Sequence, residues 1–269
     1  MQDELTARIA GQYNYYQSTL ERLQKQRKYL NYGYSMAKKE PYEQRQEQLC
    51  REVFQRANIQ PQDILVDVGF GSGEQDFLLA SLYPFGKLHG FNIAEKQVEH
   101  ANHRAALENL NDRMVFHHAP AEEMTVLTDG SVDKIMAIEC AFDFDRPRFY
   151  REAARVLRKE GRLVVADLSF SDRVRLLTER SGTLRRMGTI SKNRRAWEEY
   201  FHTVELTDIN KQTRPGAQQA VYYIASKLFK LKGFGELRSW ISLGIDSQIV
   251  VLGLLTHFLH YDFIVLKKK

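Results

Sequence analysis

Three glycines at alternate positions form the chemically most informative segment of this chain, Asp67-Val-Gly69-Phe-Gly71-Ser-Gly73-Glu74. The segment begins at the end of a short apolar run, residues 64–68, and ends at the start of a helix-compatible stretch, residues 74–83. Glycine lets a backbone turn sharply and approach a ligand closely, because no Cβ intervenes. The first turn of the following helix leaves N–H groups free for a carboxylate or a phosphate. The spacing therefore predicts a loop that binds a small ligand.

Glu74 decides between two classes of ligand for this loop. A dinucleotide fingerprint, G-x-G-x-x-G read from Gly69, requires a third glycine where Glu74 stands. A carboxylate at the start of the helix repels a pyrophosphate, whereas it tolerates an amino-acid ligand that also carries an ammonium group. The loop therefore favours a ligand with a zwitterionic end.

Read as D-x-G-x-G-x-G, the loop resembles the signature loop of the class I S-adenosylmethionine-dependent methyltransferases. The resemblance covers about residues 30–170 and is nearest to small-molecule, natural-product-tailoring O-methyltransferases. It implies S-adenosyl-L-methionine as the cofactor and S-adenosyl-L-homocysteine as the product. It also implies that four residues of the loop bind the cofactor: Asp67, Gly69, Gly71 and Gly73.

Residues 88–97 resemble the second-strand motif G-[IFL]-N-[IL] of the same family. The resemblance implies that Asn92 binds the ribose hydroxyls, where most members have an acid, and that Ile93 packs on the adenine. An amide serves this role because it can both accept and donate a hydrogen bond. Gln97 is implied as a further polar contact. Its alternative interpretation is an exposed side chain on a helix.

Residues 118–124 resemble the family's third-strand segment G-D-A-E-x-L, with Pro120 in place of the aspartate that reads the adenine amino group. The resemblance then implies that Ala121 and Glu122 hold the adenine edge. Residues 149–167 resemble the segment REAxRVLKPGGxLVxAD, which supports the fold more than the chemistry.

Carboxylates end the fourth and fifth apolar runs, where a parallel sheet places its ligands. Related enzymes read E-x-A-F-H-F at the first of these places, and here Asp143 replaces the histidine. Asp143 is our first candidate for a general base and Asp167 the second, with Glu139 beside the methionine part of the cofactor. An aspartate is a weak base at neutral pH unless burial raises its pKa. A helix N-cap is an equal alternative for Asp143, although Asp145 is the better cap.

Tyrosines near the N-terminus resemble the aromatic cover that this family folds over the cofactor: Tyr13, Tyr15, Tyr16, Tyr32 and Tyr34. Tyr32 and Tyr34 lie in a segment similar to the family's hxGYW and are expected to contact the cofactor. Packing of an amphipathic N-terminal helix explains the first three equally well. Aromatic rings near a sulfonium are favourable through cation–π contacts.

Alternating apolar and amphipathic segments must position these residues. Strands are expected at 64–68, 87–93, 114–118, 132–138, 162–168, 203–209 and 261–266. Helices are expected at 42–58, 74–83, 95–108, 147–158, 218–231 and 237–258. Strands that alternate with helices indicate βαβ units and a parallel sheet covered on both faces. The prediction is an α/β, Rossmann-like, doubly wound sheet of seven strands.

We expect a single methyltransferase domain over residues 1–269. Its parts are an N-terminal helical cover (1–60), a cofactor-binding core (61–168), and a substrate lid with the C-terminal strands (169–269). Between Arg173 and Arg195 lie eight Lys or Arg and one acid. Such a stretch is either a solvated helix face or a site that attracts an anion.

The composition, 43% apolar and 27% charged residues with a net charge of +5, is typical of a soluble globular protein. Two cysteines, Cys50 and Cys140, are too few for a disulfide framework and favour a reducing, cytoplasmic location. The longest apolar stretch, residues 249–259, is shorter than the roughly 20 residues that span a bilayer. No Cys/His spacing or dense carboxylate cluster predicts a metal.

The expected reaction is methyl transfer to a hydroxyl of a small, hydrophobic, secondary-metabolite-like acceptor. An aromatic C-terminal region would suit such a molecule: Phe229, Phe234, Trp240 and Phe258. C-methylation of an alkene or a prenyl diphosphate, RNA methylation, and a binding module without catalysis are the alternatives. We expect no nucleic-acid partner, because no RNA-binding module or amino-methylating tetrapeptide is present. The oligomeric state stays open.

Overall fold

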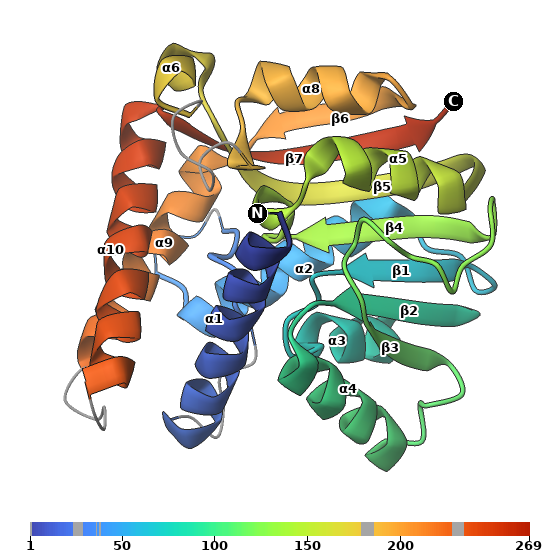
Figure 1. Ribbon diagram of the computed structural model, residues 1–269, viewed down its shortest axis with the longest axis horizontal. Helices are drawn as coiled ribbons and strands as arrows, with labels where there is room; N and C mark the ends of the chain where they lie inside the picture. Colours follow the sequence, from blue (N-terminus) through green and yellow to red (C-terminus); the bar gives the residue numbers. More distant parts are fainter. Residues whose placement is uncertain (1, 24–28, 36, 38, 179–185, 228–233) are drawn as a thin grey trace.

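A mixed sheet of seven strands organises the chain, in the order β3-β2-β1-β4-β5-β7-β6 (Figure 1). The computed structural model describes residues 2–23, 29–35, 37, 39–178, 186–227 and 234–269. The strands are β1 (Ile64–Val68), β2 (Lys87–Asn92), β3 (Met114–His118), β4 (Val132–Ile138), β5 (Leu157–Phe170), β6 (Phe201–Asp208) and β7 (Leu259–Lys268). The strands β1 to β5 run parallel, and β7 lies antiparallel between β5 and β6. The predicted seven-stranded fold class is therefore confirmed.

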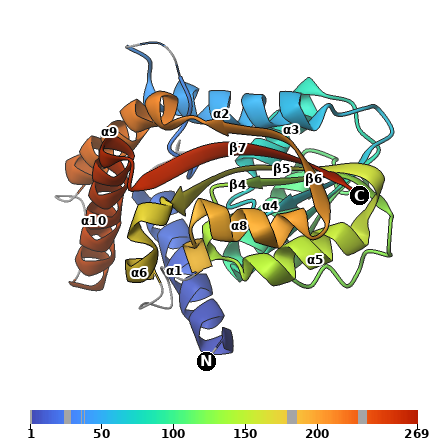
Figure 2. The same cartoon turned by 90° about the horizontal axis from the view of Figure 1, so that it is seen from above.

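Helices cover both faces of this sheet (Figure 2). They are α1 (Gln2–Leu23), α2 (Tyr42–Ala57), α3 (Glu74–Leu82), α4 (Glu95–Leu107), α5 (Arg146–Val156), α6 (Arg175–Thr178), α8 (Ile190–Glu198), α9 (Asn210–Lys227) and α10 (Phe234–Thr256), with short 3₁₀ turns η1 (Ala141–Asp143) and η2 (Asp172–Val174). Within the described parts of the chain, no helix combines the length and apolar character needed to cross a membrane.

Alternation along the strands creates two hydrophobic cores, one on each face. Leu65 of β1 belongs to the core formed with α2, α3 and α4, whereas its neighbour Val66 belongs to the core formed with α5 and α8. Successive strand side chains point to opposite faces, so a strand buried on both faces is apolar throughout. Trp197 of α8 is fully buried in the second core.

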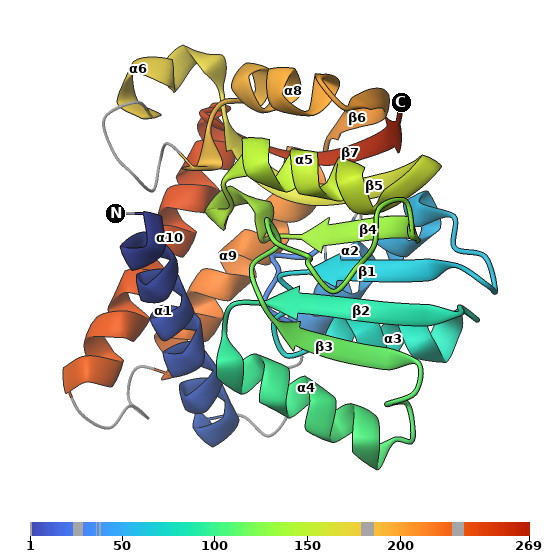
Figure 3. The same ribbon diagram turned by 45° about the vertical axis from the view of Figure 1, so that its right-hand side comes forward.

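The carboxyl ends of the parallel strands face α1, α9 and α10, which come from the two ends of the chain (Figure 3). In a sheet of this kind the order of the strands reverses at β1 and β4, and a ligand crevice opens there. The helices α1, α9 and α10 therefore lie where a cover for that crevice is needed.

Helix α9 begins at Asn210, eight residues before the predicted start, and contains Pro215 and Gly216. These two residues weaken the helical pattern of the sequence, which explains why the helix was predicted to begin only at residue 218. A Cβ at Gly216 would overlap the carbonyl oxygen of Tyr32, so this glycine permits close packing of α9 on the segment around Tyr32. Ser35 N also donates to Gln212 O at 3.2 Å across the same contact.

The sequence also underestimated structure after the fifth strand. β5 extends from Leu157 to Phe170, and α8 follows where we predicted no element. Thr189 caps α8 by accepting a hydrogen bond from Lys192 N at 3.4 Å. The helix buries only Asn193 and Trp197, and this sparse apolar pattern explains why periodicity missed it.

Candidate active site

A cavity of about 540 Å³ opens at the carboxyl ends of the parallel strands. Its walls come from α1, the segment around Tyr32, the glycine loop, the end of β2, the turn η1 and α10. Ten of the predicted site residues line it: Tyr32, Gly69, Gly71, Asn92, Ile93, Gln97, Ala121, Glu122, Glu139 and Asp143. Segments distant in the chain thus meet at the edge that the motifs predicted.

The glycine loop has the backbone shape that its sequence demands. Gly69, Gly71 and Gly73 have φ values of 65°, 60° and 83°, a region that L side chains rarely adopt. A Cβ at Gly69 would also overlap the side chain of Cys140. Gly71 has room toward the cavity, where its nearest neighbour is Leu30. The loop therefore brings bare backbone to the cavity wall.

Asp67 lies outside the cavity lining and is 1% exposed. Gln75 Nε2 donates to its Oδ2 at 3.0 Å, and its other oxygen faces the buried carboxyl of Asp76. Burial raises the pKa of Asp67 to about 7 and that of Asp76 above its usual range. We infer that the two carboxyls share a proton and that the pair supports the loop. No local motif indicated Asp76 as a partner of Asp67.

Polar side chains at the end of β2 suit a ribose. Asn92 Nδ2 donates to Gly71 O at 3.3 Å and to Gln97 Oε1 at 2.9 Å, while Asn92 Oδ1 accepts from Ala94 N at 3.0 Å. Gln97 is 1% exposed, so the alternative of an exposed helix residue is wrong. No described residue accepts from its buried Nε2. This unpaired donor fits a ligand hydroxyl, as the resemblance to the family requires.

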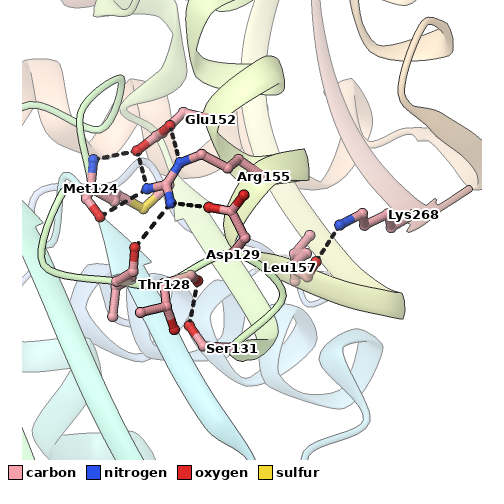
Figure 4. Close-up of polar contacts among 9 residues, drawn as sticks. Met124, Thr128, Asp129, Ser131, Glu152, Arg155, Leu157 and Lys268 are labelled. Atoms are coloured by element: carbon pink, nitrogen blue, oxygen red, sulfur yellow. Dashed lines mark hydrogen bonds and ion pairs between the residues drawn. The ribbon is translucent and has the colours of Figure 1, made fainter.

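The loop after β3 forms the adjoining wall and is held by α5. Arg155 donates to Asp129 Oδ1 at 2.7 Å and to Met124 O at 3.2 Å, while Glu152 accepts from Met124 N at 2.7 Å (Figure 4). Ala121 is buried at the cavity. Glu122 accepts from Asp145 N at 2.7 Å, and burial raises its pKa.

Glu139 connects the end of β4 to the cover. Its Oε1 accepts from Tyr32 N at 2.6 Å and from Tyr261 OH at 2.7 Å. Its φ of 49° is unusual for a residue with a side chain, and such strain is concentrated at functional sites. The Tyr32 ring reaches Ser247 of α10, and burial raises the Tyr32 pKa. Glu139 thereby orders the segment that closes the cavity.

Asp143 lies in η1 on the cavity wall, and its Oδ2 accepts from Tyr13 OH at 3.0 Å. Burial raises the Asp143 pKa to about 6, against the opposing effects of Tyr13 and Arg186. Arg186 NH1 also donates to the Asp143 carbonyl at 2.7 Å. The N-cap alternative is wrong for Asp143, because Asp145 caps α5 by accepting from Arg148 N at 3.3 Å.

Asp167 and Tyr34 lie away from the cavity, which corrects two expectations. Asp167 is buried and forms an ion pair with Arg146 at 2.9 Å, so its carboxylate faces a cation rather than an acceptor. The Tyr34 ring packs against Phe263 of β7 with 5.5 Å between centroids. Sequence position alone suggested both, because neither tertiary partner can be inferred from a local motif.

Apolar side chains make up much of the remaining cavity wall: Ile9, Phe142, Phe144, Leu168, Phe170, Met187, Ile224, Ile249 and Val250. Arg186 and Asp246 line it too, and the sequence offered only the basic stretch as a signal for the first. Phe258 is 49% exposed and outside this lining. Phe229, with the side chains of Tyr16, Phe234 and Trp240, lies outside what the structure describes.

The basic stretch contributes to two places, and residues 179–185 of it lie outside the described part of the chain. Arg186 reaches Asp143, as described above. A second pocket of about 610 Å³ is lined by Arg173, Arg175, Lys192 and Arg195 together with Asp172, Leu176, Thr189 and Ser191. The stretch is therefore more than a solvated helix face.

Comparison with known proteins identifies related sequences. Residues 66–165 match the family model described as a methyltransferase domain. Methyltransferase GfsG of Streptomyces halstedii is 32% identical over 197 residues, which cover 69% of this chain and 70% of the relative. The 27-O-demethylrifamycin SV methyltransferase of Amycolatopsis mediterranei (strain S699) is 42% identical over 106 residues, 39% of this chain and 38% of the relative.

A third relative is the erythromycin 3''-O-methyltransferase of Saccharopolyspora erythraea, 28% identical over 141 residues. That alignment covers 52% of this chain and 46% of the relative, so the chain spans less than half of this relative and of the rifamycin relative.

Solved structures share the fold over almost the whole chain. The [4+2]-cyclase SpnF has a TM-score of 0.79 at 18% identity, covering 97% of this chain and 94% of SpnF. A geranyl diphosphate C-methyltransferase from Streptomyces coelicolor A3(2) has a TM-score of 0.75 at 13% identity, covering 98% of both chains. At these identities the likeness concerns the fold alone.

Proposed function

Because this chain belongs to the class I S-adenosylmethionine-dependent methyltransferases, we propose that it methylates a hydroxyl of a small, hydrophobic, secondary-metabolite-like acceptor. The observation that carries the proposal is a buried carboxylate, Asp143, on the wall of a largely apolar cavity. Two relatives support the choice of a hydroxyl. The name of the erythromycin relative describes 3''-O-methylation, and the name of the rifamycin relative describes a 27-O-demethylated substrate.

The cofactor fits the residues at the glycine-loop end of the cavity. S-adenosyl-L-methionine, when bound, supplies a methyl group that its sulfonium charge already activates. Gly69 and Gly71 would hold the amino-acid end against bare backbone, and Asn92 with Gln97 would bind the ribose through the unpaired Gln97 amide. Glu139 would order the cover beside it by accepting from Tyr32 N.

Asp143 would act as the general base on the acceptor hydroxyl. Tyr13 OH occupies its Oδ2, and no described residue donates to Oδ1, which leaves that oxygen for a hydroxyl proton. A pKa of about 6 keeps the carboxylate ionised at neutral pH and makes it more basic than an ordinary aspartate. A positioned base of this kind contributes roughly 10²–10⁴-fold to a rate.

The remaining contribution is positioning and exclusion of water. Helices α1 and α10 supply cavity residues from opposite sides, and the apolar wall holds the acceptor against the cofactor end. Correct orientation of two reactants supplies about 7–11 kcal/mol of the barrier reduction.

The test is an assay of the purified chain with S-adenosyl-L-methionine and a panel of hydroxylated macrolides and ansamycins, with methylated products identified by mass spectrometry. Methylated product with the wild type, lost in Asp143→Asn but kept in Asp112→Asn, supports the proposal. Asp112 is an exposed carboxylate in the turn before β3 and outside the cavity lining, which makes it a matched control. Methylation at carbon, or undiminished turnover in Asp143→Asn, contradicts the proposal.

A second candidate follows from the basic pocket beside α6 and α8. Four cations line it, and a diphosphate is an anion of suitable charge for such a site. This observation favours C-methylation of an alkene that carries a diphosphate. Geranyl diphosphate incubated with the enzyme and S-adenosyl-L-methionine distinguishes the two, because a C-methylated product selects the second candidate.

A further inference from the structure

Three aspartates lie side by side on the antiparallel edge of the sheet. The strand register pairs Asp167 of β5 with Asp262 of β7, and Asp262 with Asp208 of β6. Directly opposed residues share a face of the sheet, about 4.5–5.5 Å apart at Cβ. His260, two residues before Asp262, lies on that same face. The strands thus bring together four groups that could bind a cation.

Three of these groups are close enough to share one ion. Ligand atoms of Asp208, His260 and Asp262 all lie within 4.8 Å of one another. His260 Nδ1 and Asp208 Oδ2 are 3.3 Å apart. Two ligands about 2.1 Å from a zinc ion are at most about 4.2 Å apart, so a small rotation of a side chain completes the geometry. His260 and Asp208, whose side chains are 27% and 44% exposed, are the groups with room for that rotation.

Buried polar atoms in the same cluster have no partner among the described residues. They are Asp262 Oδ2, Asp167 Oδ1 and Ser169 Oγ, and their residues are 4%, 2% and 3% exposed. Ser169 is opposite His260 in the register. Buried polar groups are normally hydrogen-bonded, and buried charges are paired or coordinate a metal. These unpaired atoms therefore point to a missing ligand.

The charges of the cluster favour a cation as that ligand. Arg146 NH2 pairs with Asp167 by donating to Oδ2 at 2.9 Å, whereas among the described residues no Lys or Arg forms an ion pair with Asp208 or Asp262. An ionised carboxylate buried without a counter-charge is very costly. An imidazole nitrogen and two carboxylate oxygens are ligands typical of Zn²⁺ and Mn²⁺.

We propose that Asp208, His260 and Asp262 bind a divalent cation of the Zn²⁺ or Mn²⁺ type. Asp167 Oδ1 and Ser169 Oγ would then form hydrogen bonds with a water molecule bound to the cation. The three ligands come from β6 and β7, at the solvent-exposed margin of the sheet, so the ion has a path of entry along Asp208. Nothing in this site requires the methyl donor, and the site is separate from the cavity-lining residues.

The place of the site in the fold assigns it a structural role. β5 leads into the segment before α8, β6 leads into α9, and β7 follows α10. Asp208 also caps the turn into α9, because its Oδ1 accepts from Asn210 N at 2.8 Å. An ion at this point joins the strands where the covering helices leave the sheet. Binding to the folded state alone would stabilise it.

The test is calorimetric titration of the chelator-treated full-length chain with Zn²⁺ alone and with Mn²⁺ alone. We expect saturable binding of one ion per chain, and at least tenfold weaker binding in His260→Gln and in Asp262→Asn. His202→Gln is the matched control, because His202 is an exposed histidine on β6 that takes no part in the cluster. Its affinity should equal that of the wild type.

Asp208→Asn keeps the test valid if a buried substitution unfolds the chain, since Asp208 is exposed. We expect the ion to raise the thermal midpoint of the wild type and of His202→Gln, but not of Asp208→Asn. Absence of saturable binding, or equal affinity in the wild type and in Asp208→Asn, would overturn the proposal. Loss of affinity in His202→Gln would overturn it too, by assigning the ion to surface histidines.

Discussion

At the scale of single residues, Asp143 shows how burial adjusts one group to a task. Its carboxylate is removed from water, which raises the pKa, while the Tyr13 hydroxyl and the Arg186 guanidinium stabilise the charged form. Burial prevails, and the result is a pKa of about 6. Such a group is ionised at neutral pH and still accepts a proton, as a general base requires.

The first prediction concerns the pH dependence of turnover. In the proposed mechanism the ionised form of Asp143 is the active one, so kcat/KM should fall as pH decreases below about 6. Tyr13→Phe removes a hydrogen bond to the charged form, so the midpoint should move to higher pH. Rate profiles of the wild type and Tyr13→Phe check this. A midpoint that stays in place in Tyr13→Phe would assign the titration to another group.

The second prediction separates backbone strain from cavity shape. Gly69→Ala puts a side chain on a residue with an unfavourable φ, and its Cβ would overlap the Cys140 side chain. The substitution should therefore weaken S-adenosyl-L-methionine binding at least tenfold. Gly130 has the same φ of 65° but lies far from the cavity lining, with Arg158 Cα at 3.9 Å. Gly130→Ala should cost about 1 kcal/mol of stability and leave affinity unchanged. Calorimetric titration and urea unfolding measure both effects, and equal affinities in the two variants would refute the close approach at Gly69.

At the scale of elements, the strands were predictable because an apolar run between turns has few alternative structures. The bounds of β1, β3 and β4 agree with the prediction. Both faces of β1 and β4 are buried, whereas β3, at the edge of the sheet, alternates buried and partly exposed side chains. The glycine loop was predictable for a similar reason, as the backbone itself requires Gly69, Gly71 and Gly73. Helix α8 was missed because its buried face consists of two residues.

Residues of the site that depend on tertiary packing could not be predicted in the same way. The pairing of Tyr13 with Asp143 joins positions 130 residues apart, and Arg186 reaches the same loop from the basic stretch. Asp167 stands near the end of β5, where a catalytic residue would be expected, yet its carboxylate pairs with Arg146. Asp208, His260 and Asp262 meet only because β7 lies antiparallel beside β6, so no local spacing could indicate a metal.

The third prediction concerns the packing of α9. Replacing glycine by alanine inside a helix normally stabilises it by about 1 kcal/mol. Gly216→Ala should instead destabilise the chain, because the new Cβ overlaps Tyr32 O. Gly244→Ala in α10 is the matched control, since its Cβ would lie at an ordinary 3.5 Å from Ile224. Urea unfolding of both variants decides the matter, and a stability gain in Gly216→Ala would refute the contact.

At the scale of the whole molecule, the cavity is closed by opposite ends of the chain. α1 reaches the core through polar contacts: Tyr13 to Asp143, and Arg186 to Thr6 Oγ1 at 3.3 Å. α9 and α10 close the other side and approach the segment around Tyr32. The folded chain therefore depends on contacts of very long sequence separation, and its stability responds to buried groups beneath them.

The fourth prediction concerns stability against pH. Burial raises the pKa of the Asp67 and Asp76 carboxyls above their unfolded values, so the folded chain binds more protons than the unfolded chain. This contribution is fully present below the unfolded pKa and is lost as pH rises through about 7. One extra proton corresponds to about 1.4 kcal/mol per pH unit. The free energy of unfolding, measured in urea above and below neutral pH, should decrease less with rising pH in Asp76→Asn than in the wild type. The same pH dependence in both proteins would contradict the shared proton.

The fit of Gly216 against Tyr32 also bears on how such enzymes can be recombined. Helix α9 and the segment of residues 29–35 have matched surfaces, joined further by the Ser35 to Gln212 hydrogen bond. If residues 210–256 alone were replaced by those of a relative, the new helix would pack against residues 29–35 of this chain, whose surface fits the original helix. A graft that also includes residues 29–35 from the same donor would preserve the contact between the two segments. Acceptor preference should therefore be transferable only when both segments come from the same donor.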